Sequence, residues 1–124
     1  MTSMVIIGAG PGGYEAASVA AAGGVEVTVV EETGIGGAAV LTDCVPSKTL
    51  IATAEVTSTL RRAAELGLRH TETFEVDLDA VNFRVRQLAQ AQSDDISRGL
   101  ERKGVRLISG RARLATGAPG HLHR

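Results

Sequence analysis

Cysteine and aromatic residues are scarce in this chain, and its charges almost balance. A single cysteine, Cys44, stands among 124 residues, which excludes a framework of internal disulfides. Aromatic residues make up 2% of the sequence and tryptophan is absent, so an aromatic platform for stacking nucleobases is not expected. The formal net charge is -1, which argues against a general nucleic-acid binder.

No lysine or arginine precedes Lys48. A secretory signal starts with basic residues, and this N-terminus has none. The apolar stretch 16–30 is interrupted by Gly23, Gly24 and Glu26, which makes it unsuitable as a membrane span. We therefore expect a cytoplasmic protein without a membrane partner.

The sequence does contain an alternation of β-branched runs and helical stretches. Residues 4–7 and 25–30 are short apolar runs, typical of strands buried on both faces of a parallel sheet. A glycine-rich turn and an alanine-rich helix, 14–22, lie between them, so the three elements form a right-handed βαβ unit. A third strand is expected at 105–108, and the strands should be ordered 105–108, 25–30, 4–7.

Two longer helices are expected between the second and third strands. The first should cover 47–66 and end at Gly67, and the second should start after Asp77 as N-cap and end at Gly104. The segment 33–45 reads as a loop or a broken helix. The faces expected to pack contain Leu50, Ala54, Thr57, Leu60 and Ala64 in the first helix, and Leu78, Val81, Val85, Leu88, Ile96 and Leu100 in the second.

Residues 8–13 read Gly-Ala-Gly-Pro-Gly-Gly and lie between the first strand and the first helix. In the pattern Gly-x-Gly-x-x-Gly, Gly8 permits a tight turn, Gly10 lets the backbone approach a pyrophosphate, and Gly13 lets the helix pack closely on the sheet. The start of the helix adds unpaired N–H groups and a positive dipole end. Because no basic side chain is nearby, the backbone would have to bind the anion.

Glu31 ends the second strand at about the distance from Gly13 that a dinucleotide site requires. Its carboxylate could accept hydrogen bonds from a ribose diol, and it would repel a 2′-phosphate. The expected ligand therefore has an unphosphorylated adenosine ribose. A glycine-rich turn without a ligand remains the alternative.

Residues 36–48 read Gly-Gly-Ala-Ala-Val-Leu-Thr-Asp-Cys-Val-Pro-Ser-Lys. Together with 8–13 and with Val-Val-Glu at 29–31, this segment resembles the pyridine nucleotide-disulfide oxidoreductases, the group of dihydrolipoamide dehydrogenase and glutathione reductase. The resemblance implies an α/β fold of the FAD/NAD(P)-binding Rossmann-like class, a parallel sheet with helices, here as an incomplete domain. It also implies FAD as the cofactor of the first βαβ unit, with NAD(P)H bound only by the complete enzyme, a homodimer.

The resemblance also implies roles for individual residues. Cys44 aligns with the family's cysteine nearest the flavin and Lys48 with the lysine beside the flavin, so these two are the candidate catalytic residues. Glu31 would bind the adenosine ribose, and the turn that contains Ala112 would contact the adenine. The residues implied to bind FAD are Gly8, Gly10, Pro11, Gly12, Gly13, Glu31, Glu32, Gly36, Gly37, Ala38, Lys48 and Ala112.

One departure from the family pattern concerns the redox disulfide. The family's first cysteine falls on Ala39, and one sulfur cannot exchange electrons as an internal dithiol. The chain therefore resembles members that pass electrons from flavin to a quinone-like acceptor. Three alternatives stay open: a fragment of a dihydrolipoamide dehydrogenase-type reductase, a non-catalytic FAD- or ADP-binding module, and a truncated inactive product.

The role of Cys44 also stays open. Cys44 is either a thiol beside the flavin or a small buried residue, and no metal site is expected.

A second Gly-x-Gly-x-x-Gly is absent from the sequence. The chain therefore looks like the N-terminal part of an FAD-binding domain over 1–115, followed by a flexible tail, 116–124. In such a segment the strand 4–7 is left as an exposed apolar edge, which invites association between chains.

Overall fold

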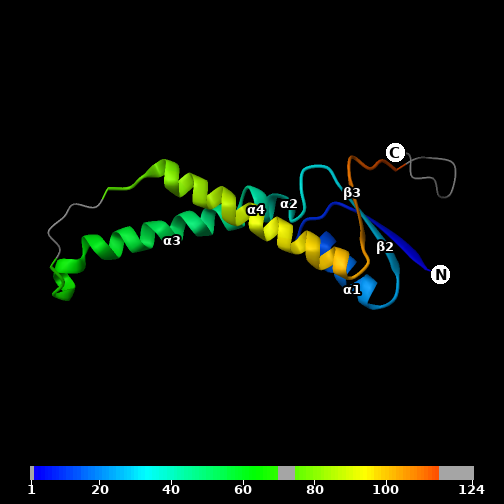
Figure 1. Ribbon diagram of the computed structural model, residues 1–124, viewed down its shortest axis with the longest axis horizontal. Coiled ribbons are helices and arrows are strands. Elements are labelled where there is room, and N and C mark those ends of the chain that lie inside the picture. The colour runs from blue at the N-terminus through cyan, green and yellow to red at the C-terminus, as the bar shows by residue number, and fades with distance from the viewer. Residues whose placement is uncertain (1, 70–74, 115–124) are drawn as a thin grey trace.

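A three-stranded parallel sheet forms one end of the molecule (Figure 1). The computed structural model describes residues 2–69 and 75–114. Its strands are β1 (Ser3–Ile7), β2 (Glu26–Glu31) and β3 (Arg106–Ser109), hydrogen-bonded in the order β1-β2-β3. Met4 lies opposite Val27 in this register, and Val29 lies opposite Leu107. The predicted strands and their order are confirmed.

Helix α1 (Pro11–Ala22) connects β1 to β2 and starts three residues before the predicted Tyr14. Pro11 is the first helical residue. A proline fits there because its fixed φ suits a helix and its missing N–H would have no partner in the first turn. The helix therefore begins inside the glycine-rich turn, with Gly10 as its N-cap.

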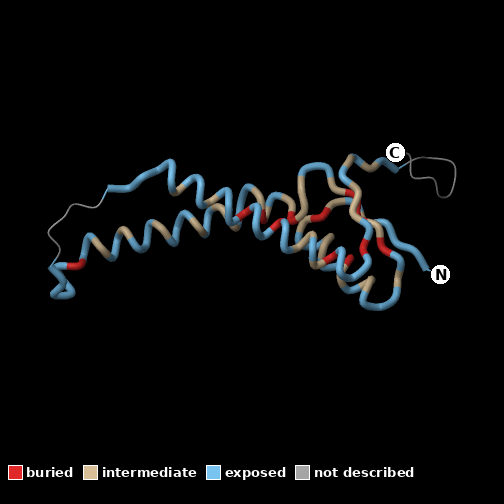
Figure 2. Tube along the Cα trace, in the orientation of Figure 1, coloured by how far each residue is buried: buried red, intermediate tan, exposed pale blue. Residues whose placement is uncertain are grey.

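The core lies on one face of the sheet. Val27 and Val29 of β2 are buried against Ala17 of α1 and Leu100 of α4 (Leu78–Arg102). Figure 2 shows buried residues gathered where these two helices meet the strands. On the other face Val5 and Ile7 are 50% and 56% exposed. The helices that pack on the sheet are α1 and α4, so one face is covered and the other is open.

Two long helices extend from the sheet as an arm (Figure 1). They are α3 (Cys44–Arg61) and α4, which lie side by side. The short helix α2 (Gly37–Leu41) precedes α3, and the 3-10 helix η1 (Ala63–Leu66) follows it. The predicted N-cap of α4 is confirmed, because Asp77 Oδ1 accepts a hydrogen bond of 2.9 Å from the Ala80 N–H. The proposed tail, 116–124, and its boundary at 115 lie outside the described residues.

The predicted faces of the two long helices need correction. In α3 the half-buried positions include Thr49, Thr53 and Thr57, whereas Leu50 and Ala54 are exposed. Each threonine hydroxyl donates to the carbonyl four residues earlier, at 2.8–3.2 Å. A threonine with its hydroxyl satisfied in this way can face a neighbouring helix, because only its methyl group and stem then need packing.

In α4 the buried positions are Ala89, Ser93 and Leu100. Leu78 and Leu88, which were predicted to pack, are exposed. The rest of the predicted face is confirmed, because Val81, Val85 and Ile96 are half-buried and Leu100 is buried. The pattern missed the small residues Ala89 and Ser93, which the helix also presents to its neighbours. Small side chains suit a close helix contact because the two backbones can approach each other.

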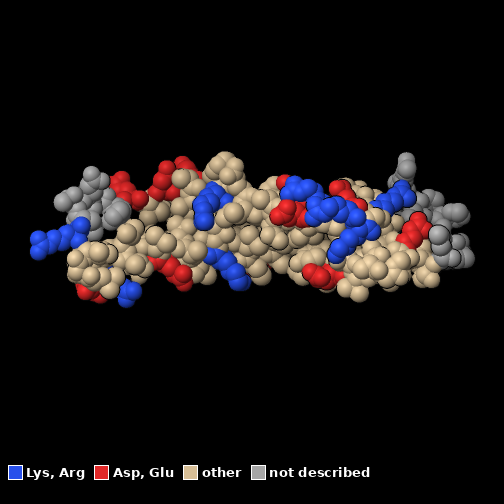
Figure 3. Space-filling model, turned by 60° about the horizontal axis from the view of Figure 1, so that its bottom comes forward, with Lys and Arg blue, Asp and Glu red and all other residues tan. Residues whose placement is uncertain are grey.

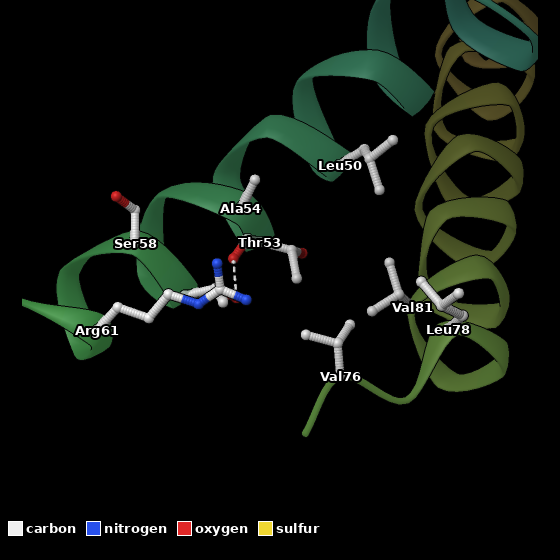
Figure 4. A pocket seen from close by; sticks show the side chains of 9 residues that line it. Leu50, Thr53, Ala54, Ser58, Arg61, Val76, Leu78 and Val81 are labelled. Atoms are coloured by element: carbon white, nitrogen blue, oxygen red, sulfur yellow. Dashed lines mark hydrogen bonds between the residues drawn. The ribbon is translucent and has the colours of Figure 1, made fainter. Parts of the chain in front are cut away.

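A shallow apolar groove explains where some of these leucines lie. Leu50, Leu78 and Val81 line a hollow of about 300 Å³ between α3 and α4, together with Val76 from the segment before α4 (Figure 4). Basic and acidic side chains are interspersed over the face shown in Figure 3. Within 2–69 and 75–114, no helix is both long and apolar enough to cross a membrane.

Candidate functional site

The loop between β1 and α1 has the close packing that its glycines predict. Gly8 has a φ of 95°, in the region that favours glycine, and its N–H donates to the Val30 carbonyl at 2.8 Å. A Cβ on Gly13 would lie 1.9 Å from the Gly8 carbonyl oxygen, so the helix can approach the loop only without a side chain there. The predicted reasons for Gly8 and Gly13 agree with this geometry.

Gly10 differs from Gly13 because it is open on its Cβ side. A Cβ built on Gly10 meets no atom within 4 Å, and the same holds for Gly12. Neither glycine is therefore required by packing within the described chain. The space outside Gly10 leaves its backbone accessible at the N-terminus of α1, where unpaired N–H groups and the helix dipole favour an anion.

The loop before α2 lies directly against the first glycine loop. The Gly36 N–H donates to the Ala9 carbonyl at 2.8 Å, and a Cβ on Gly37 would lie 3.0 Å from the Gly10 Cα. Gly36 has a φ of 98° and is the N-cap of α2. Ala38 follows in the first turn of α2. The two segments that carried the family resemblance are thus brought together, although about 25 residues separate them in sequence.

Glu31 joins these loops to the end of β2. Its Oε2 accepts a hydrogen bond of 2.7 Å from the Ala9 N–H. Its Oε1 accepts hydrogen bonds from the N–H and the hydroxyl of Thr33, both at 2.8 Å, and a longer one of 3.4 Å from the Gly34 N–H. The Glu31 carboxylate is therefore bound by the first glycine loop, through Ala9, and by the segment after β2, through Thr33 and Gly34.

The pKa of Glu31 is about 2, below its ordinary value of 4.5. Partial burial opposes ionisation and acts in the other direction, but the hydrogen bonds from Ala9, Thr33 and Gly34 together outweigh it. Donors aimed at a carboxylate stabilise its charged form. Glu31 is therefore an anion at any physiological pH, which suits it to accept hydrogen bonds.

A hollow of about 280 Å³ lies where the three strands end. Ile7, Gly8, Val30, Glu31, Glu32, Thr33, Gly110, Arg111 and Ala112 line it. The Gly110 N–H donates to the Glu31 carbonyl at 2.8 Å, which brings the turn with Ala112 to the end of β2. Ligands of parallel α/β sheets bind at the carboxyl ends of the strands, so this position fits a nucleotide.

Cys44 and Lys48 lie on α3, outside this hollow. They are four residues apart, so their side chains leave the same face of the helix, and both are exposed. The hypothesis that Cys44 is a small buried residue is therefore wrong. The described structure places these two residues after α2, beyond the second loop, and not among the groups that line the strand ends.

Three contacts at the site were not anticipated from the sequence. The Ala9 N–H and the Thr33 groups bind Glu31, and Arg111 forms an exposed ion pair of 3.8 Å with Glu32. A main-chain donor such as that of Ala9 leaves no trace in residue type. Thr33 had a signal, because a hydroxyl residue two positions after a carboxylate can form a local hydrogen-bonded turn.

Comparison with known proteins assigns the fold and the family. Residues 2–121 match the family described as "Pyridine nucleotide-disulphide oxidoreductase". The chain belongs to this family. A crystal structure of LpdA from Mycobacterium tuberculosis superposes with a TM-score of 0.88 at 48% identity, over 98% of this chain and 26% of that one. The predicted α/β Rossmann-like class is thereby confirmed, as part of a larger domain.

Two proteins with curated names are also similar over most of this chain. The NAD(P)H dehydrogenase (quinone) of Mycobacterium tuberculosis is 48% identical over 124 residues, which cover 97% of this chain and 25% of that protein. A dihydrolipoyl dehydrogenase of Chlamydia muridarum is 36% identical over 110 residues, or 89% and 23%. The chain thus spans about a quarter of the length of these relatives.

The flavoprotein disulfide reductase RclA of Escherichia coli has the same fold, with a TM-score of 0.71 at 21% identity, over 92% of this chain and 22% of that one. At this identity the likeness concerns the fold alone.

Proposed function

We propose that this chain binds the ADP portion of FAD at the carboxyl ends of its strands. The observation that carries the proposal is the meeting of the two glycine loops with Glu31, through the Ala9 N–H and carbonyl. Gly8, Gly10, Pro11, Gly12 and Gly13 would surround the diphosphate. Glu31 and Glu32 would lie at the ribose, and Ala112 at the adenine.

The residues present fit such a ligand. Gly10 has free space where a side chain would stand, and the start of α1 supplies N–H groups without a side-chain cap. Glu31 offers a permanent negative charge to hydroxyl groups and disfavours a phosphate on the ribose. Gly36, Gly37 and Ala38 would continue the site towards the flavin.

In a complete enzyme, bound FAD would accept a hydride from NAD(P)H and deliver electrons to an acceptor. Lys48 would place a cation beside the flavin and stabilise negative charge there. Cys44, one helical turn earlier, would place a thiol on the same side. Lys48 would thus serve in both binding and catalysis, and Cys44 in catalysis. NAD(P)H binding and a homodimer would belong to the complete enzyme.

We infer that the acceptor is quinone-like and not a disulfide. The chain has one cysteine, and Ala39 stands where the second sulfur of a redox pair would be needed. The relative that is 48% identical is named NAD(P)H dehydrogenase (quinone). The dihydrolipoyl dehydrogenase relative, at 36% identity, supports the alternative of a disulfide reductase. A single thiol in this segment weighs against it.

The binding proposal is tested by titrating the 124-residue chain with ADP and FAD, with calorimetry and the visible spectrum of the flavin as readouts. We expect Gly10→Val to abolish binding and to leave the fold intact, since its Cβ has open space. Ala16→Val, on an exposed part of α1, is the control and should bind as the parent does. Equal binding by the Gly10 variant would refute the proposed diphosphate position.

A second candidate is a nucleotide-binding module without turnover, favoured because the candidate catalytic residues Cys44 and Lys48 do not line the hollow at the strand ends. The chain is mixed with FAD, NADH and a quinone, and NADH absorbance is followed. Constant absorbance together with FAD binding supports the module. Steady NADH consumption supports an enzyme in this chain itself.

A further inference from the structure

Thr33 makes an unusual pair of contacts just beyond the end of β2. Its backbone N–H and its hydroxyl both donate to Glu31 Oε1 at 2.8 Å. The Thr33 side chain is exposed, so packing in the core does not explain these two contacts. Both donors instead converge on one oxygen of the carboxylate that the proposed function places at the ribose.

The two oxygens of Glu31 are therefore not equivalent. An ionised carboxylate offers about four acceptor positions, two on each oxygen. On Oε1, Thr33 supplies two short hydrogen bonds, and the Gly34 N–H adds a longer one at 3.4 Å. On Oε2, Ala9 supplies a single hydrogen bond of 2.7 Å. Oε1 is saturated by the chain, whereas Oε2 has one acceptor position left.

We propose that Thr33 is a positioning residue, which engages Oε1 of Glu31 and so leaves Oε2 to receive a ribose hydroxyl. This inference rests on the proposed function, because it concerns how the same site selects an intact ribose. Thr33 acts through Glu31 and does not itself bind the nucleotide. Without the hydroxyl, the carboxylate keeps its backbone donors but loses one of the two short hydrogen bonds that engage Oε1.

The test compares Thr33→Val with Thr33→Ser in the 124-residue chain. Valine keeps the shape and the N–H, and serine keeps the hydroxyl. The Kd values of ADP and of 2′,3′-dideoxy-ADP are measured by calorimetry, and their ratio reports the contribution of the ribose hydroxyls. We expect Thr33→Val to reduce the preference for ADP by about three- to tenfold, which is the effect of losing one ordinary hydrogen bond. Thr33→Ser should keep the preference.

A purely structural role for Thr33 would weaken both nucleotides equally and leave their ratio unchanged. A second readout needs no ligand: an NMR pH titration of the Glu31 carboxyl should show its pKa rising from about 2 towards 4.5 in Thr33→Val, but not in Thr33→Ser. If Thr33→Val changes neither the ratio of the two Kd values nor the titration of Glu31, this inference is overturned and the proposed function still stands. If the parent chain binds no ADP, or binds it without regard to the ribose hydroxyls, the proposed function fails and this inference fails with it.

Discussion

At the scale of single residues, position 13 has room for a hydrogen atom and nothing larger. A Cβ there would lie 1.9 Å from the Gly8 carbonyl oxygen, which is backbone and cannot rotate away. We expect Gly13→Ala to lower the free energy of unfolding by about 1–3 kcal/mol, as overpacking does. Urea unfolding followed by circular dichroism measures this. Gly12→Ala is the control, because its Cβ meets open space; equal loss in both variants would contradict the steric explanation.

Glu31 should make the stability of the fold depend on acid pH. Its pKa is about 2 in the folded chain and about 4.5 in an ordinary environment. A lowered carboxyl pKa adds stability that is complete above the ordinary value and is lost as the pH falls towards the folded value. Between these two values, the parent should lose about 1–2 kcal/mol more than Glu31→Gln, after an allowance for solvent screening.

Denaturant unfolding at several pH values from about 6 down to 2 checks this difference. The neighbours Glu32 and Arg111 are the same in both proteins, so subtracting the two curves isolates Glu31. Parallel curves would show that the hydrogen bonds from Ala9 and Thr33 do not hold the ionised carboxylate.

At the scale of elements, Ser93 fastens α4 to the loop between β2 and α2. Its buried hydroxyl donates to the Ile35 carbonyl at 2.6 Å. We expect Ser93→Ala to lower the free energy of unfolding by about 1–2 kcal/mol, because the carbonyl loses its partner. Ser97→Ala is the matched control, since the Ser97 hydroxyl bonds within its own helix, to the Ser93 carbonyl. Thermal unfolding of both variants should rank Ser93→Ala as the less stable.

Sequence patterns predicted the strands better than the helix faces. The β-branched runs placed β1, β2 and β3 and their order, because a buried parallel strand needs continuous apolar residues. In the arm, the large residues Leu50 and Leu78 misled the prediction, whereas other predicted positions, such as Leu60, Val81 and Val85, are half-buried as expected. Thr49, Thr53 and Ser93 count as polar in a pattern, but their hydroxyls are satisfied by nearby carbonyls.

The candidate site was predictable where it depends on residue type. Glycines that need positive φ or close approach, such as Gly8 and Gly13, carry their reason in the sequence. Glu31, the acid at the end of β2, was likewise predicted from its residue type and its position. The contact between the loop at Gly36 and the carbonyl of Ala9 could not be predicted from the residues alone, because it joins two backbone groups.

At the scale of the whole molecule, the sheet has one open face. Val5 and Ile7 are 50% and 56% exposed there, and β1 is an edge strand. Exposed apolar edges favour association, so we expect the isolated chain to self-associate as its concentration rises. Val5→Lys should shift it towards the monomer in analytical ultracentrifugation. Val19→Lys, on an exposed position of α1, should not; a parent chain that stays monomeric would contradict the expectation.

The meeting of the two glycine loops has a consequence for how this protein can vary. The groups that join the loops to each other, Gly36 N–H and Ala9 carbonyl, belong to the main chain. Any residue that fits at these positions keeps its main-chain N–H and carbonyl groups, except that proline has no N–H. A saturation survey of 8–13 and 34–37 should therefore sort substitutions by backbone conformation and by space. Gly8 and Gly36, at positive φ, should tolerate fewer replacements than Gly10 and Gly12, whose Cβ positions are open.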